Sequence, residues 1–284
     1  MYRHSIYHSM KAVKIRSNSQ RLRKSIKALA CTIAFSFLAS HCQVQSGEKD
    51  ETLELAFLAT VLNGCTANSI VAVVGPAASG KTTLLKVIQG FIKPTVGSVL
   101  IDGRSLLSLD LENYRSQVSM VTANPSFFTG TIEENLRRAR RNISERELRE
   151  ATMLSGLDSI ISNIEGGLAY RLDNATNSLP SSYRGIIALA RALVSDPKIL
   201  LFDEIFANLD KSLQSELLDK MPAIAKNKTL FFVTHDMRVA STMSRVLVME
   251  DGEVAGLDEP SKLLKTCDLY KKLWALDNYT ETKG

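Results

Sequence analysis

The chain has 284 residues, of which 45% are hydrophobic and 23% charged, and its formal net charge is +5. This composition is typical of a globular protein with one large domain or two small ones. No apolar run reaches the roughly 18 residues of a spanning helix, so we expect none. The four cysteines lack metal-ligand spacing, which predicts unpaired thiols in a reducing compartment. They are Cys31, Cys42, Cys65 and Cys267.

The positive charge is concentrated at the N-terminus. Residues 1–47 contain eight Lys and Arg and no Asp or Glu, so they carry +8 and the rest of the chain −3. We interpret residues 1–25 as a basic, flexible arm. Such an arm is either a solvated tail or a contact for an anionic membrane surface or nucleic acid, and we expect no specific nucleic acid partner.

Residues 28–42, "ALACTIAFSFLASHC", follow the arm. A basic stretch before an apolar one is also the pattern of a secretory signal. The basic region is unusually long for a signal, and His41 replaces the small residue expected before a lipid-modified cysteine. A buried β-strand is therefore the favoured interpretation.

The clearest motif begins with "IVAVV" at 70–74, a β-branched run typical of a strand buried on both faces. The next residues, "GPAASGKT" at 75–82, match the phosphate-loop pattern G-x-x-x-x-G-K-[ST]. Helical spacing follows in "KTTLLKVIQ", and Gly90 is a natural stop. The sequence therefore predicts a strand, a phosphate-binding loop and a helix in that order.

Each residue type in this loop has a physical reason. Gly75 and Gly80 permit tight turns and close backbone approach, while the helix N-terminus attracts anions. Lys81 supplies a point charge for the outer phosphates, and the Thr82 hydroxyl is a ligand for Mg²⁺. The predicted phosphate-binding residues are Gly75, Pro76, Ala77, Ala78, Ser79, Gly80, Lys81, Thr82 and Thr83.

Two further apolar strands are predicted to end in functional side chains. "KILLFDE" at 198–204 ends in Asp203, a second Mg²⁺ ligand, and Glu204, a general base for the attacking water. "TLFFVTHD" at 229–236 carries His235, which we expect to contact the outer phosphate or orient the water. Open α/β sheets bind ligands at the carboxyl ends of their strands, so His235 should lie at the same edge as Asp203 and the phosphate loop.

Together these motifs resemble the nucleotide-binding domain of ABC transporter ATPases. The resemblance covers residues 26 to about 278, and the C-terminal "SKLLKTCDLYKKLW" is similar to that of exporter-type domains. The supporting stretches are "GSVLIDG" at 97–103, "FFTGTIEENL" at 127–136, "ALARALVSDPKILLFDE" at 188–204, "ANLD" at 207–210 and "VLVMEDGEVA" at 246–255.

The resemblance implies an α/β P-loop NTPase fold over residues 26–284. Its parts would be a RecA-like core, an antiparallel β-subdomain and an inserted α-helical subdomain at 131–182. It implies ATP and Mg²⁺ as cofactors, with Phe37 stacked on adenine and Asp210 in the family's D-loop. The implied partners are a second ABC ATPase subunit, identical or different, and a transmembrane domain at the cytoplasmic face of a membrane.

The sequence departs from the family pattern at two places. Ala123 stands where the family has a glutamine that touches Mg²⁺. Residues 179–183 read Leu-Pro-Ser-Ser-Tyr where the family signature reads Leu-Ser-Gly-Gly-Gln. Ser181 and Ser182 keep their N–H groups, so we expect a weakened phosphate clasp across the dimer. If the glycine positions were left-handed, serine there would cost about 1 kcal/mol.

The leading hypothesis is an ATP-binding subunit that hydrolyses MgATP to drive transport by a separate membrane domain. This subunit would have an intact phosphate loop and an eroded signature. A weakly or non-hydrolysing regulatory or scaffold module is the alternative, favoured by Ala123 and Pro180. A soluble ABC ATPase acting on nucleic acid is suggested only by the basic arm. Such proteins carry two phosphate loops in one chain, and a second is not found.

Overall fold

The computed structural model describes residues 69–94, 98–102, 104–173 and 179–281. The basic arm, the predicted strand at 33–37 and Phe37 lie outside these residues. Within the described residues, none of the helices combines the length and apolarity needed to span a bilayer.

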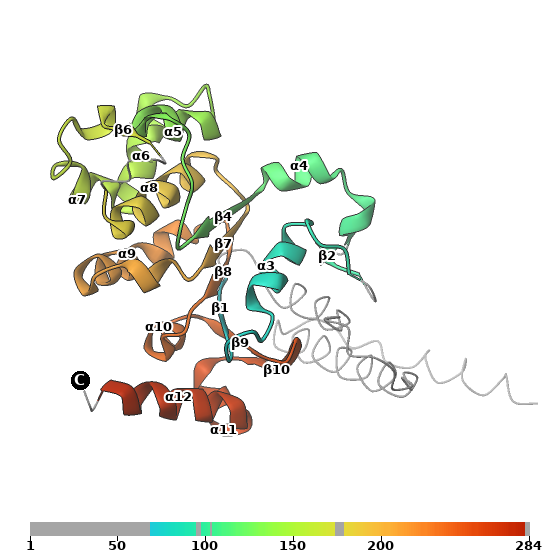
Figure 1. The fold of residues 1–284 in the computed structure, drawn as a ribbon. Coiled ribbons are helices and arrows are strands. Elements are labelled where there is room, and N and C mark those ends of the chain that lie inside the picture. The colour runs from blue at the N-terminus through green and yellow to red at the C-terminus, as the bar shows by residue number, and fades with distance from the viewer. Residues whose placement is uncertain (1–68, 95–97, 103, 174–178, 282–284) are drawn as a thin grey trace, which may run out of the picture. The chain divides into compact units, whose positions relative to one another are not determined.

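A six-stranded sheet in the order β10-β9-β1-β8-β7-β4 forms the core (Figure 1). Every neighbouring pair is parallel except β10, which runs antiparallel to β9. Thr122, Asp203 and Val233 stand side by side in the register of β4, β7 and β8. The carboxyl ends of these strands therefore form one edge. The strands are β1 (Ile70–Val74), β4 (Val118–Thr122), β7 (Ile199–Asp203), β8 (Thr229–Val233), β9 (Arg245–Glu250) and β10 (Glu253–Asp258).

Both faces of the sheet are covered, as the uninterrupted apolar runs predict. Alternate residues of a strand point to opposite faces, so Val71 and Val73 belong to the core beneath α3, whereas Ala72 and Val74 belong to the other core. Figure 1 shows α3 on one side of the strands and further helices on the other. These helices are α3 (Lys81–Ile88), α8 (Ser181–Val194), α9 (Lys211–Ile224) and α10 (Met237–Ser241).

The region predicted to be helical, 131–182, is described except for residues 174–178. It contains α5 (Ile132–Ala139), α6 (Glu145–Ser155), α7 (Leu157–Ile161), the 3₁₀ turn η2 (Gly167–Ala169) and a short antiparallel pair, β5 (Gly130–Thr131) with β6 (Arg171–Leu172). The proposed boundary at 182 falls inside α8, which packs on α5, α6 and α7 and also on β4. One helix thus joins this region to the sheet.

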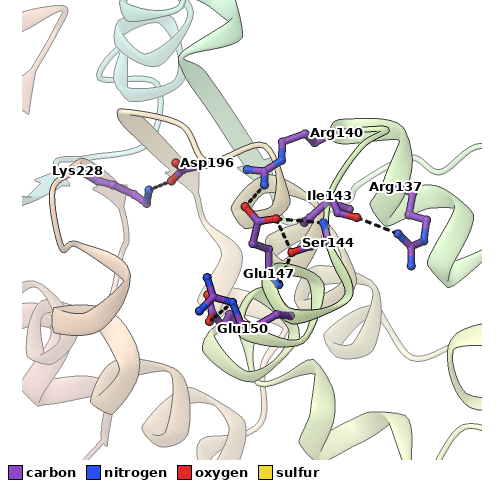
Figure 2. Close-up of polar contacts among 9 residues, drawn as sticks. Arg137, Arg140, Ile143, Ser144, Glu147, Glu150, Asp196 and Lys228 are labelled. Carbon is purple, nitrogen blue, oxygen red and sulfur yellow. Dashed lines mark hydrogen bonds and ion pairs between the residues drawn. The ribbon is translucent and has the colours of Figure 1, made fainter.

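Local sequence explains how α6 begins. Ser144 and Glu147 form a capping box, in which each side chain satisfies a backbone N–H at the helix start. Arg140 pairs with Glu147, and Arg137 donates to the carbonyl of Ile143 at 3.3 Å (Figure 2). The Ser144 and Arg140 bonds hold the pKa of Glu147 at about 2, below its ordinary value of 4.5.

Smaller elements complete the chain. β2 (Leu100–Ile101) and β3 (Arg104–Ser105) form an antiparallel pair, consistent with the expected β-subdomain. The others are η1 (Leu106–Ser108), α4 (Leu111–Ser116), η3 (Ile205–Asn208), α11 (Pro260–Thr266) and α12 (Asp268–Glu281).

Candidate functional site

The phosphate loop lies between β1 and α3, as predicted. A Cβ placed on Gly75 would stand 2.2 Å from the Met249 carbonyl oxygen and 2.7 Å from Ser79 Oγ, so no side chain fits there. Gly80 has φ 93°, in the left-handed region, and is the N-cap of α3. The N–H of Gly252, in the turn between β9 and β10, donates to the Ser79 carbonyl at 3.2 Å. This hydrogen bond ties the phosphate loop to the β9–β10 hairpin.

Lys81 is the buried cation of this loop. Its Nζ donates to the carbonyls of Gly75 at 3.0 Å and Pro76 at 2.7 Å, and only 6% of the residue is exposed. Burial lowers the pKa of Lys81, while the negative charges of Glu204 and Asp203 act in the opposite direction. The ammonium group thus sits at the centre of the loop, where an anion would meet it.

The backbone of Ala78 was not anticipated from the sequence. Its φ is 60°, a left-handed conformation that a residue with a Cβ adopts at a cost of about 1–2 kcal/mol. Such strain is characteristic of functional loops whose path is fixed by their surroundings.

Thr82 and Asp203 meet beside this loop. The Thr82 hydroxyl lies 3.2 Å and 3.3 Å from the two carboxylate oxygens of Asp203. Burial raises the pKa of Asp203, and the Thr82 hydrogen bond partly offsets it. A hydroxyl and a carboxylate at the mouth of a phosphate loop are the oxygen donors that Mg²⁺ prefers, so these residues fit the predicted metal.

Glu204 and His235 form a direct pair. His235 Nε2 lies 2.8 Å from Glu204 Oε1, and both side chains remain accessible to solvent, with exposed fractions of 54% and 40%. Glu204, immediately after β7, has a φ of 56°, a left-handed conformation that is strained for a residue with a Cβ. The two residues follow the neighbouring parallel strands β7 and β8, which brings both of them to the same edge of the sheet.

Ala123 immediately follows β4 at the same edge. Its N–H donates to the Asp203 carbonyl at 3.1 Å, and its own carbonyl accepts from Asn208 Nδ2 at 3.0 Å. The position therefore adjoins the metal-ligand candidate, but its methyl side chain offers no oxygen. Sequence reasoning missed Asn208, although it lies within the "ANLD" stretch.

The remaining predicted residues come from other elements. Ser181 and Ser182 are the first residues of α8, behind Pro180 as N-cap, and Asp210 caps α9 by accepting from the Leu213 N–H at 2.9 Å. Neither serine has a positive φ. The conditional cost of left-handed serines therefore does not arise, because both positions are already helical.

Comparison with known proteins agrees with this geometry. Residues 60–207 match the sequence profile described as ABC transporter. The chain belongs to the ABC transporter family. This ABC chain is 31% identical over 207 residues to the uncharacterized ABC transporter ATP-binding protein YknV of Bacillus subtilis (strain 168). It is 30% identical over 206 residues to a multidrug resistance ABC transporter ATP-binding and permease protein of Lactococcus lactis subsp. cremoris (strain MG1363).

These matches cover 73% and 72% of the ABC chain but only 34% and 35% of the relatives, so the chain spans about a third of their length. Among solved structures, a bacterial Atm1-family ABC exporter with ATP bound superposes with a TM-score of 0.69 at 28% identity. That match covers 74% of the ABC chain and 37% of the exporter chain. The P-loop NTPase fold predicted from the sequence is thus confirmed.

Proposed function

We propose that this chain is the ATP-binding subunit of an ABC transporter and that it hydrolyses MgATP at a dimer interface to drive transport. The observation that carries the proposal is the 2.8 Å contact between His235 and Glu204, at the sheet edge that also presents Lys81 and the Thr82–Asp203 pair. The ATP-bound exporter and the relatives named as ATP-binding and permease proteins support it.

In this proposal, residues 75–83 hold the phosphates through backbone N–H groups, the start of α3 and the Lys81 ammonium. Thr82 and Asp203 hold Mg²⁺, which neutralises phosphate charge when bound. Glu204 accepts a proton from the attacking water. His235, with Nε2 protonated, donates to Glu204 and keeps its carboxylate oriented. Phe37 stacks on the adenine.

The proposed partners are a second ABC subunit and a transmembrane domain, with the chain at the cytoplasmic face of the membrane. Asp210 and the start of α8 would face the partner's nucleotide. Pro180 offers neither a hydroxyl nor an N–H at the signature position, whereas Ser181 and Ser182 keep both groups. A partner with an intact signature would complete this chain's phosphate loop, and the reciprocal site would be the weaker one.

A regulatory module that binds nucleotide without appreciable turnover is the second candidate, and Ala123 favours it because that position supplies no metal ligand. The test compares wild type with Glu204→Gln. Binding of MgATP by calorimetry should be preserved, and the ATPase rate should fall by about 10²–10⁴. Glu165→Gln, an exposed glutamate of the helical region, is the control and should change neither quantity.

The outcomes separate the candidates. Hydrolysis by Glu204→Gln at the wild-type rate means that Glu204 is not the base. Nucleotide binding without hydrolysis, even when a second ABC subunit and a membrane domain are supplied, supports the regulatory module.

A further inference from the structure

The C-terminal helix α12 places one face against the rest of the chain, and the proposed function uses none of it. Tyr270 on this face is fully buried, and Leu273 packs against the core. Asp277 lies seven residues after Tyr270, which is about two helical turns, so it shares that face. The helix is thus anchored near its start and presents a carboxylate further along.

That carboxylate binds the segment that carries His235. Asp277 Oδ2 accepts a hydrogen bond from the Met237 N–H at 2.8 Å. Met237 is the first residue of α10, and Asp236 accepts from the next two N–H groups, those of Arg238 at 2.9 Å and Val239 at 3.2 Å. The first turn of α10 therefore takes one of its acceptors from α12.

His235 stands between two fixed points of the backbone. Upstream, the Thr234 N–H donates to the carbonyl of Val73 in β1 at 3.2 Å. Downstream, the Met237 N–H donates to Asp277. The side chain of His235 is then directed to Glu204 at 2.8 Å.

Apolar packing accompanies this hydrogen bond on the α12 side of His235, because Met237 of α10 and Leu273 of α12 belong to the same hydrophobic core. A cavity of about 230 Å³ lies there, lined among others by Gly75, His235, Leu273 and Asp277. Side chains of α12 thus border the same space as the first glycine of the phosphate loop. The hydrogen bond from the Met237 N–H to Asp277 is thus a polar link from α12 to the His235 segment, beside the direct contact of α12 with α10.

We infer that Asp277 is a positioning residue for His235: through the Met237 N–H, α12 fixes the turn that aims His235 at Glu204. The effect on hydrolysis rests on the proposed ATPase function. The effect on the backbone of residues 234–239 is independent of that proposed function.

The test uses the full chain and three variants. Asp277→Ala removes the acceptor without weakening α12, because alanine favours helix. Asp277→Asn keeps a side-chain oxygen that can accept from Met237. Asp268→Ala is the matched control, because Asp268 is an exposed aspartate of the same helix whose carboxylate pairs with Lys271 and not with the His235 segment among the described residues.

Three measurements are expected to agree. Hydrogen exchange of residues 234–239 should accelerate in Asp277→Ala and return towards wild type in Asp277→Asn. The kcat for MgATP should fall about two- to tenfold in Asp277→Ala, with KM and calorimetric affinity unchanged. Emission of Trp274, the single tryptophan of the chain, should stay constant and show that α12 remains in place. Asp268→Ala should match wild type throughout.

Unchanged exchange in Asp277→Ala overturns the inference, as does faster exchange with an unchanged kcat. A shift of Trp274 emission also overturns it, because the loss would then follow from displacement of the whole helix. If the wild-type chain hydrolyses no ATP with its partners, the ATPase proposal fails by itself. The exchange data still decide whether Asp277 holds the His235 segment.

Discussion

Replacing Gly75 by alanine should damage the phosphate loop through a contact with a strand far away in the sequence. The new Cβ would lie 2.2 Å from the Met249 carbonyl oxygen, whereas real Cβ atoms keep at least 3.0 Å from such atoms, so one side must move by about 0.8 Å. Met249 is 1% exposed and pairs with Val254 in the β9–β10 ladder. The loop will therefore give way more readily than the strand.

The expected cost is about 1–3 kcal/mol of unfolding free energy, the usual penalty for overpacking a filled site. MgATP affinity should fall as well, because the moved backbone carries the N–H groups that would bind phosphate. Urea unfolding measures the first quantity and calorimetric titration the second.

Gly185→Ala provides the matched contrast within the same chain. Gly185 is buried in α8, yet an added Cβ would meet no atom within 4 Å apart from its chain neighbours and the backbone of its own helix. Alanine should therefore stabilise the protein by about 0.5–1 kcal/mol through helix propensity and leave MgATP binding unchanged. Equal stabilities for the two variants, or wild-type affinity in Gly75→Ala, would show that the close approach to Met249 does not constrain the loop.

Four other substitutions probe separate parts of the chain. Lys81→Ala should weaken MgATP binding about ten- to a hundredfold, the value of a charge-assisted contact, and unchanged calorimetric affinity would contradict the phosphate-loop assignment. Pro180→Ser should raise the ATPase rate of a homodimer modestly, and adding Ala123→Gln should raise it more than additively, since both groups act on one transition state; rates equal to wild type would refute the eroded-signature account. The pKa of Glu147 is depressed to about 2, so its contribution to stability is present above pH 4.5 and is lost as the pH falls from there towards about 2. The urea midpoint should fall less between about pH 5 and about pH 3 in Ser144→Ala than in wild type. Equal falls would show that Ser144 does not lower the pKa of Glu147.

Some features of the site could be predicted from the sequence, because they depend only on neighbouring residues or on the order of the strands. The order of strand, loop and helix around Lys81 follows from residues adjacent in the chain. The approach of Thr82 to Asp203 follows because parallel strands end at one edge. The place of His235 at that edge has the same origin, whereas its direct contact with Glu204 was not predicted.

Features set by distant contacts were not predictable. The Met249 carbonyl behind Gly75 and the Asp277 carboxylate on Met237 each join segments that only the folded sheet brings together. The strained φ of Ala78 likewise depends on the surroundings of the loop. Whether the serines beginning α8 would be left-handed was left open by the sequence, and the structure makes both positions helical behind Pro180.

The geometry of α8 has a mechanical consequence. Near its far end, Ser195 Oγ lies 2.8 Å from Ser119 Oγ of β4, which gives the helix a fixed point on the sheet. Its 14 residues extend about 21 Å from there to Ser181. A tilt of about 10° around the serine pair would swing the first turn by about 3.6 Å, more than the length of a hydrogen bond. A small rotation of α8 about its contact with the sheet is therefore enough to form or break contacts at the first turn of the helix.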